Sequence, residues 1–266
     1  MTNITLGRYI PTNSIIHKLD PRMKIINMLF LMVAVFIPAR FYGYGILSVV
    51  AVSLILISKL KFGFILKSLK PVLLMLIFLL VINVFVLRTG YVVINVFGLF
   101  VYSDALFQTA YIVIRLLLMI MITTLLTATT KPLDLTLGIE DLLAPFKRFK
   151  VPAHEIAMMI SIALRFIPTL IEESQRIMKA QASRGVDLTE GKINEKIVAI
   201  LSLIVPLFVS SFQRAEELAD AMEARGYSPT SLRTRYKQLE VTLTDWTSLF
   251  LVLSVLMAVG ALAWFV

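Results

Sequence analysis

Two arginine–glycine pairs are the residues best suited to a specific polar contact. They lie in QASRGVD (181–187) and MEARGYS (222–228), each after a small residue and about forty residues apart. A guanidinium presents a planar fork of donors that fits a carboxylate or backbone carbonyls. Arginine before glycine also suits the last turn of a helix, because glycine is a common C-terminal cap and a cation suits the negative end of the helix dipole. A cap explains either pair alone, whereas the repeat favours docking at both.

Residue sets that could carry out catalysis are incomplete. GVDLTEGKI (185–193) has one residue too many between its glycines for a phosphate-binding loop, and isoleucine where that loop has serine or threonine. His154-Glu155 has no second histidine four residues on, as a zinc-protease helix requires. The chain has two histidines and no cysteine, which excludes a disulfide, Cys-ligated zinc and a cysteine nucleophile. We expect no catalytic residue, metal site or cofactor in this chain.

The elements that position these residues must fit a membrane protein. Hydrophobic residues make up 58% of the 266 positions, and the mean hydropathy is +0.86, whereas a soluble domain is about 45–50% apolar. A spanning helix needs about 17–25 apolar residues. Loops are expected at 59–70, which carries four lysines, and at 88–104. Spanning helices are expected at residues 25–37, 45–58, 72–87, 105–130 and 243–266.

Two further apolar stretches, Glu155–Ile171 and Ile197–Phe212, continue into polar helical sequence. Because EESQRIMKAQASRG and QRAEELADAMEARG cannot enter lipid, we interpret each stretch as one long helix, apolar at its start and water-exposed at its end. A seven-span protein is the alternative. The sequence thus predicts an all-α, polytopic fold with about five transmembrane helices. Its parts are residues 1–130 with four spans, 131–240 with the long helices, and 241–266 with the last span.

Basic residues gather at the ends of the apolar stretches. Region 131–240 has fifteen lysines and arginines against fourteen acidic residues, so nearly all of the net charge of +9 arises elsewhere. By the positive-inside rule, we expect the N-terminus and region 131–240 in the cytoplasm and the C-terminus outside the cell membrane. This distribution argues against nucleic acid, which needs a basic face with stacking aromatics. The expected inner basic residues are Arg8, Lys18, Arg22, Lys24, Lys59, Lys61, Lys67 and Lys70.

Isolated polar residues inside the apolar stretches need partners. Arg115 lies in the middle of an expected span, where a charge is costly and often functional. A structural role, in which Arg115 pairs inside the bundle, is favoured over a transport role. Asn83 is expected to form a hydrogen bond between helices. Pro168 is expected to kink or begin a segment, because proline removes a backbone donor.

Three stretches resemble the T component of energy-coupling factor transporters, the transmembrane subunit of a class of vitamin- and metal-importing ABC systems. They are GRYIPTNSIIHKLDPRMK, with Ser14, His17 and Leu19-Asp20-Pro21-Arg22 in place, the stretch from TTKPLDL to KAQASRG, and ADAMEARG. Together they extend the resemblance over nearly the whole chain. The family triplet Ala-Arg-Gly is present at 224–226, whereas 183–185 reads Ser-Arg-Gly.

The resemblance implies a cytoplasmic coupling domain of long crossing helices, whose tips insert into grooves on two ABC ATPases. ATP and magnesium would be bound by those ATPases, and a membrane-embedded S component would bind the substrate. The implied ATPase-docking residues are Ala182, Ser183, Arg184, Gly185, Ala224, Arg225 and Gly226. Residues implied to face the S component or the membrane interface are Ile160, Leu164, Ile167, Ile200, Leu203 and Leu207. Implied structural residues are Asp20, Pro21, Arg22, Pro168 and Pro206.

Three other functions fit parts of the sequence. A self-contained secondary transporter would need polar groups at mid-membrane, for which only Arg115 and Asn83 are candidates. An ordinary ABC importer permease would carry its own substrate path and typically one short coupling helix. A membrane-embedded enzyme would need an acid–base or metal set that the sequence lacks. The T-component interpretation accounts best for the twin tips.

Overall fold

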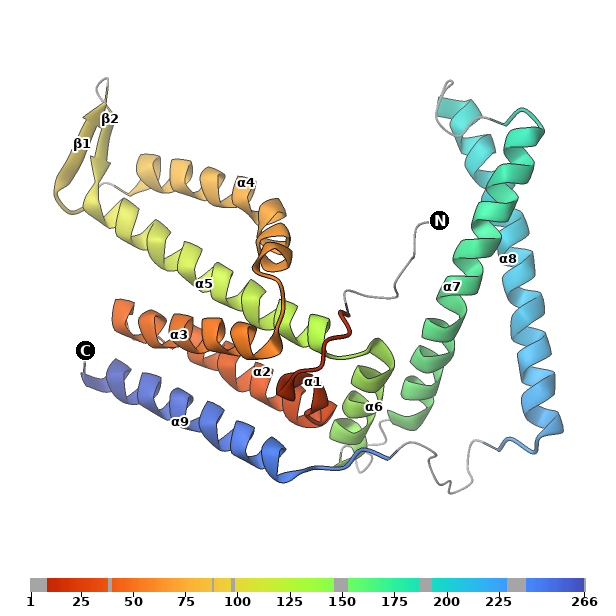
Figure 1. Cartoon of the computed structure of the whole chain (residues 1–266). Helices are drawn as coiled ribbons and strands as arrows, with labels where there is room; N and C mark the ends of the chain where they lie inside the picture. Colours follow the sequence, from red (N-terminus) through yellow and green to blue (C-terminus); the bar gives the residue numbers. More distant parts are fainter. Residues whose placement is uncertain are drawn as a thin grey trace. The chain divides into compact units, whose positions relative to one another are not determined.

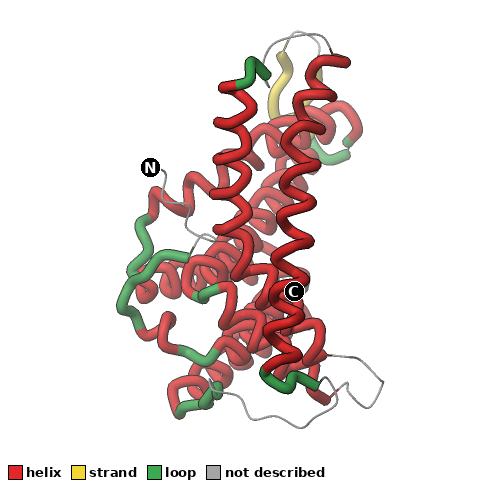
Figure 2. Tube along the Cα trace, turned by 90° about the vertical axis from the view of Figure 1, so that its right-hand side faces the viewer, coloured by secondary structure: helices red, strands yellow, loops and turns green. Residues whose placement is uncertain are grey.

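Helices form most of the chain, as the sequence predicts (Figures 1 and 2). The computed structural model describes residues 9–37, 40–87, 89–96, 99–145, 153–186, 193–228 and 238–265. Its elements are α1 (Ile15–Lys18), α2 (Pro21–Phe36), α3 (Arg40–Ser58), α4 (Phe62–Val86), β1 (Val92–Val96), β2 (Leu99–Tyr102), α5 (Ser103–Thr129), α6 (Pro132–Leu143), α7 (Ala153–Ser183), α8 (Ile193–Ala224) and α9 (Leu243–Phe265).

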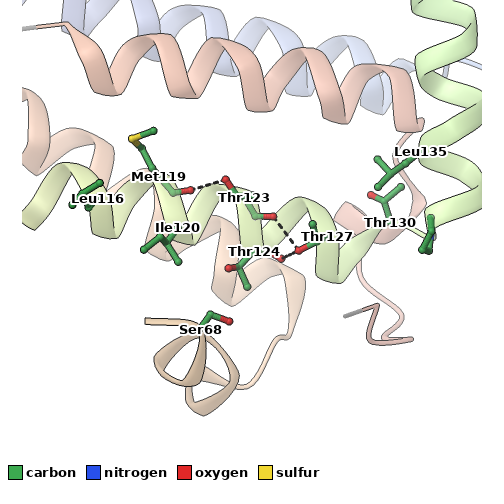
Figure 3. Close-up of a pocket in the computed structure, with 10 residues that line it drawn as sticks. Ser68, Leu116, Met119, Ile120, Thr123, Thr124, Thr127, Thr130 and Leu135 are labelled. Atoms are coloured by element: carbon green, nitrogen blue, oxygen red, sulfur yellow. Dashed lines mark hydrogen bonds between the residues drawn. The ribbon is translucent and has the colours of Figure 1, made fainter. Parts of the chain in front are cut away.

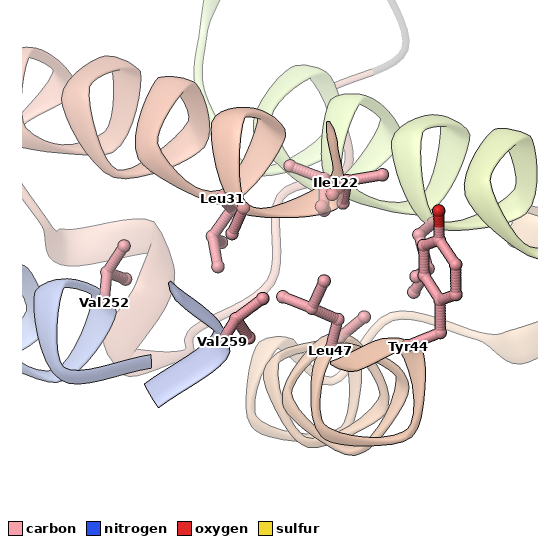
Figure 4. Packing of buried hydrophobic residues seen from close by; sticks show 10 residues of the cluster. Leu31, Tyr44, Leu47, Ile122, Val252 and Val259 are labelled. Carbon is pink, nitrogen blue, oxygen red and sulfur yellow. The ribbon is translucent and has the colours of Figure 1, made fainter. Parts of the chain in front are cut away.

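One compact unit, residues 7–142 and 239–266, holds α1 to α6, the hairpin and α9. Its core lies among α2, α3, α5 and α9, with α4 packed against α5 (Figure 4). Small residues such as Ala34 and Ala51 let these helices approach closely. The buried hydrophobic cluster is Leu31, Ala34, Val35, Tyr44, Leu47, Ala51, Leu118, Ile122, Val252 and Val259.

Six described helices are long and apolar enough to cross a membrane, against the expected five or so. Four of them are α3, α4, α5 and α9, which coincide with expected spans. The other two are α7 and α8. The stretch 25–37 is helical as far as Phe36, but α2 has only 16 residues, fewer than the about 17–25 that a spanning helix needs. Length and composition therefore do not separate α7 and α8 from spanning helices.

Two expected loops are wrong. Residues 62–70, expected in a loop, are the first part of α4. The burial of their side chains fits a helix with one face against the protein: Ile65 is buried, and Lys67 and Lys70 are exposed. Pro71 lies inside α4, which bends in Figure 1, as a proline that removes a backbone donor allows. Residues 92–96 and 99–102 form an antiparallel hairpin, consistent with their β-branched and aromatic side chains.

The second unit, residues 143–238, is built on α7 and α8. These helices have 31 and 32 residues, about 45–50 Å each. They pack against each other and cross while running in opposite directions (Figure 1). The predicted pair of long crossing helices is therefore present. Helix α6, which the sequence-based division grouped with them, belongs to the other unit.

Candidate functional site

The first arginine–glycine pair forms the C-terminal cap of α7. Gly185 has φ +84°, a left-handed conformation that glycine adopts without strain. Its N–H donates to the carbonyl of Ala182 at 3.0 Å, and the N–H of Val186 donates to the carbonyl of Gln181 at 3.1 Å. These two bonds define a Schellman cap and satisfy carbonyls that the helix end would leave unpaired. Arg184 occupies the position between the helix and its capping glycine.

The second pair has the same geometry at the end of α8. Gly226 has φ +71°, and its N–H donates to the carbonyl of Glu223 at 2.8 Å. The N–H of Tyr227 donates to the carbonyl of Met222 at 2.9 Å. Arg225 therefore stands at the position in its cap that Arg184 has in the first. The two tips match in backbone conformation as well as in sequence.

The tips lie at opposite ends of the helix pair. Near the end of α7, the Gln181 Nε2 donates to the carbonyl of Ser202 at 3.1 Å. Eight residues earlier in α7, Glu173 lies 3.7 Å from Arg214. Residues earlier in α7 thus contact residues later in α8. Ala224 lies 22 residues beyond Ser202, which is about 33 Å along α8. The antiparallel arrangement thus directs the tips away from each other.

Every predicted docking residue is exposed at its tip: Ala182, Ser183, Arg184 and Gly185 on α7, and Ala224, Arg225 and Gly226 on α8. Among the residues that the structure describes, neither guanidinium has a hydrogen-bond or ion-pair partner. The small residues beside each arginine leave room for another surface to approach closely. A free guanidinium on such a tip can donate in a fork to carboxylates or carbonyls.

The apolar residues predicted to face a membrane partner divide into two groups. Ile160 and Ile167 on α7 and Ile200 on α8 are 38–48% exposed, whereas Leu164, Leu203 and Leu207 are half-buried. Six further exposed apolar residues of α8, at spacings of three and four residues, were not predicted individually. Such a stripe is the pattern of a helix face that binds an apolar surface, so its spacing could have revealed it. The stripe consists of Ile197, Leu201, Ile204, Val205, Phe208 and Phe212.

Both prolines of this region lie inside helices. Pro168 is in α7 and Pro206 is in α8, so neither begins a segment, contrary to one of the two expectations for Pro168. Each removes one backbone donor from the middle of its helix. Pro168 is half-buried and Pro206 is exposed.

Asp20, Pro21 and Arg22 organise the start of α2. Asp20 is the N-cap, and its carboxylate accepts from the N–H of Arg22 at 2.8 Å, with Pro21 in the first turn. The Arg22 guanidinium binds both carboxylate oxygens of Asp20, at 3.1 and 2.9 Å, and donates to the carbonyl of Leu239 at 2.9 Å. Asp20 is 4% exposed. The geometry is that of a paired, buried helix cap, as a structural role requires.

Asp245 completes this cluster and was missed from the sequence. It is fully buried and accepts from the N–H of Asp20 at 2.7 Å. Its second oxygen accepts from the N–H and the hydroxyl of Thr242, at 2.7 and 2.6 Å. The latter contacts are the half of a capping box in which the side chain in the first turn of α9 accepts from the N-cap residue. One carboxylate therefore joins the starts of α2 and α9.

His17, one of the residues that carry the resemblance, fixes the segment before α2. Its ring lies within hydrogen-bond distance of the hydroxyl of Ser14, at 2.7 Å, the hydroxyl of Thr12, at 3.1 Å, and the carbonyl of Ile10, at 3.0 Å. Burial lowers the pKa of His17, and the charge of Lys24 acts in the same direction. The neutral form is therefore favoured in the folded protein.

Arg115 and Asn83, the two polar residues singled out within the apolar stretches, each have a partner on another helix of the same unit. The Arg115 Nε donates to the Tyr44 hydroxyl at 3.0 Å, and its guanidinium lies 5.7 Å from the centre of the Phe36 ring. The Asn83 amide donates to the Thr109 hydroxyl at 3.0 Å, which confirms the expected bond between helices. Both contacts favour a structural role for these residues.

The residues described define a polytopic helical membrane protein with two matched, exposed helix tips. Within those ranges, no three His, Asp or Glu side chains lie close enough together to hold a metal ion. What the tips can do is make charge-assisted polar contacts with other surfaces.

Comparison with known proteins supplies the family. The model of the CbiQ family, described as cobalt transport protein, matches residues 12–236. The chain is 43% identical over 258 residues to the energy-coupling factor transporter transmembrane protein EcfT of Bacillus subtilis (strain 168), with 97% of each protein covered. It is 44% identical over 264 residues to the EcfT of Acidaminococcus fermentans, covering 99% of this chain and 98% of that protein. The chain belongs to this family, and the resemblance drawn from its sequence is confirmed.

Proposed function

We propose that this chain is the transmembrane coupling component of an energy-coupling factor importer. It transmits ATP-driven motion of two ABC ATPases to a membrane-embedded S component that binds a vitamin or metal ion. The observation that carries the proposal is the pair of matched caps, Arg184-Gly185 and Arg225-Gly226, at opposite ends of one antiparallel helix pair. Two equivalent tips that face away from each other suit two similar grooves, one on each ATPase.

The arginine at each tip can donate hydrogen bonds to a partner protein. The Schellman bonds already satisfy the carbonyls at the helix ends, so the guanidinium can bind acidic or carbonyl groups of an ATPase groove. Ala182 and Ala224 are exposed and small, which permits the close approach that such contacts need. A hydrogen bond to a charged group contributes about 1.5–3 kcal/mol. Reversing both charges should therefore weaken docking strongly.

The apolar starts of the two helices supply a surface for the S component. The exposed stripe of α8, from Ile197 to Phe212, is long and lacks charge, so it suits an apolar helix surface or lipid and not water. Ile160 and Ile167 add exposed apolar area on α7. A partner seated here would rest on the same helices whose tips contact the ATPases, so that motion of the tips reaches it directly.

In this account the chain is not an enzyme and carries no cofactor. ATP and magnesium are bound by the two ATPases, and the S component sets the substrate. The protein is a multi-pass protein of the cell membrane, with the N-terminus and the long helices in the cytoplasm and the C-terminus outside. The eight basic residues expected on the inner flanks support that orientation.

The two rival transport functions, a secondary transporter and an ordinary ABC importer permease, account for fewer features of the structure. A secondary transporter would bind its substrate through polar groups at mid-membrane. Arg115 and Asn83, the two candidates, are bonded to Tyr44 and Thr109. An ordinary importer permease has no need of two matched tips. Both rivals are therefore less economical than coupling.

Co-purification from native membranes in mild detergent tests the proposal. We expect two ABC ATPases and a small membrane protein to accompany the wild-type chain, and Arg184→Glu/Arg225→Glu to lose the ATPases. Lys179→Glu/Lys196→Glu, which changes the charge of the same two helices equally, should retain them. ATPases retained by the arginine variant would contradict the docking role of the tips. A wild-type chain that purifies alone and still transports would overturn the function.

A further inference from the structure

The second unit, residues 143–238, is inserted into the first unit, which holds α1 to α6 and α9, at two points of the chain. The chain leaves the first unit after Leu142, near the end of α6, and returns to it at Leu239, shortly before α9. Asp141 and Leu239 lie at these two points, and both contact the side chain of Arg22 at the start of α2. One side chain of the first unit therefore holds both ends of the inserted segment.

The Arg22 guanidinium distributes its donors over three groups that are far apart in the sequence. Its Nη2 donates to the carbonyl of Leu239 at 2.9 Å, 217 positions away, as well as to Asp20. Its Nη1 forms an ion pair of 3.5 Å with Asp141, 119 positions away. A helix cap needs only the local contact with Asp20. The planar fork of an arginine can bind several groups in this way, whereas the ammonium of a lysine is a single point.

The returning chain is attached to the start of α2 a second time. Thr242, shortly after Leu239, donates through its N–H and its hydroxyl to Asp245, at 2.7 and 2.6 Å. Asp245 also accepts from the N–H of Asp20, the N-cap of α2, at 2.7 Å. The segment before α9 is thus fixed at two places to the start of α2.

The departing chain is fixed to α2 at three successive points. The Lys24 Nζ donates to the carbonyl of Thr129, the last residue of α5, at 3.2 Å. Leu135, in the first turn of α6, lines a pocket together with residues from the end of α5 (Figure 3). Further along α6, a Cβ added to Gly138 would lie 3.4 Å from the backbone nitrogen of Arg22, so the two helices approach closely there. The ion pair of Arg22 in the last turn of α6 completes the series.

We infer that Arg22 is the positioning residue through which motion of the second unit reaches α2 and α9. The inference rests on the proposed coupling function. A second unit displaced by the ATPases pulls on both of its chain ends. Because Arg22 binds both ends and is joined through Asp20 to Asp245, the displacement is passed to the starts of α2 and α9. Without Arg22, the connecting segments would take up much of the displacement.

The test follows α9 in the assembled transporter. Phe78→p-acetylphenylalanine on α4 and Met257→p-acetylphenylalanine on α9 place nitroxide labels at two exposed positions, by a reaction that spares cysteine. Electron double resonance measures the distance between the labels before and after a non-hydrolysable ATP analogue and magnesium are added. We expect the analogue to shift this distance in the otherwise wild-type complex. Arg22→Gln, which removes the fork, should abolish most of the shift, and Asp141→Ala, which releases one chain end, should reduce it.

Ser248→Ala is the matched control for a purely structural role of Arg22. It removes the hydrogen bond of 2.9 Å between Asn27 on α2 and Ser248 on α9, so it weakens the same pair of helices but leaves every contact of Arg22. The wild-type shift should persist in this variant. If Arg22 only stabilised the fold, the shift would follow thermal stability in Ser248→Ala as it does in Arg22→Gln.

A covalent bridge separates the position of the chain end from the folding of the unit. The chain has no cysteine, so in Arg22→Cys/Asp141→Cys a short bis-maleimide joins the two introduced thiols before assembly. We expect the shift to be absent without the bridge and to return with it. A full shift in Arg22→Gln or, if that variant does not fold, in Asp141→Ala would overturn the inference, as would a bridged variant or a wild-type complex without a shift. ATPases that fail to assemble with the wild-type chain would instead contradict the proposed function.

Discussion

Glu173 on α7 and Arg214 on α8 form an ion pair of 3.7 Å across the two long helices. Arg176, one turn along α7, lies at the same distance from the same carboxylate. The pair links the middle parts of the helices, between the Gln181–Ser202 hydrogen bond and the tip at Arg225. It thus contributes to the register that places the two arginine tips at opposite ends.

Glu173→Gln should lower the stability of the helix pair only slightly. Arg214 is 35% exposed and Glu173 is 20% exposed, and a pair of this kind contributes about 0.2–1 kcal/mol. Thermal unfolding of the detergent-purified protein measures the loss. The double exchange Glu173→Arg/Arg214→Glu restores a pair of opposite charges, so it should lose less stability than Glu173→Arg and Arg214→Glu lose together. A double exchange that loses more than this sum would show that the pair does not hold the register.

Gly185→Ala and Gly226→Ala should each destabilise a tip by about 1 kcal/mol, because alanine is strained at positive φ. An added Cβ meets nothing within 4 Å at either position, so the strain in φ is the whole effect. Hydrogen exchange of the last turn of each helix measures it. Gly63→Ala is the matched control: it also has open space but lies inside α4, where alanine should be neutral or stabilising by about 0.5–1 kcal/mol. Unchanged exchange at both tips would argue against the caps.

The caps show what sequence can predict. An arginine before glycine after a helical stretch indicates a C-cap, because the signal lies within a few adjacent residues, and both caps have this form. The helix α8 and the Asn83 hydrogen bond were predictable for the same reason of local pattern. The exposed stripe of α8 from Ile197 to Phe212 was also readable from its spacing. The start of α4 was missed because the four lysines of residues 59–70, two of which lie in α4, suggested a loop, although a helix can carry lysines on one exposed face.

Asp245→Ala should destabilise the protein by about 3 kcal/mol or more. It removes the acceptor for the N–H of Asp20 and for both donors of Thr242, and a buried donor left unpaired costs about 1–3 kcal/mol. Asp245→Asn, which keeps one acceptor oxygen, should lie between alanine and wild type. Asp104→Asn alters an exposed aspartate at the start of α5 and should change thermal stability little. Equal effects at both aspartates would contradict the cluster.

The Asp20–Asp245 bond lay beyond prediction for a physical reason. The two residues are 225 positions apart, and nothing in either local sequence specifies which helix starts will meet. The antiparallel pairing of Glu173 with Arg214 was hidden in the same way. Packing between distant segments decides both contacts, whereas caps and periodicity are decided by neighbours along the chain.

Stability should fall as the pH falls below about 6.5, the ordinary pKa of histidine. The pKa of His17 is lowered in the folded protein, so the unfolded chain takes up a proton first and folding is opposed in that window. Above it both states are neutral and the contribution is constant. Melting temperatures measured across this range should slope less in His17→Gln than in wild type. An unchanged slope in His17→Gln would contradict the assignment.

The central claim, one ATPase on each tip, is tested most directly by cross-linking. The chain has no cysteine, so Ser183→Cys and Ala224→Cys place single thiols beside Arg184 and Arg225 without removing either arginine. With a thiol- and amine-reactive cross-linker on the assembled transporter, we predict that each variant captures one ATPase. The double variant should capture two, whereas Glu172→Cys, exposed in the middle of α7, should capture none. Capture of one ATPase by both tips together, or of none, would contradict the account.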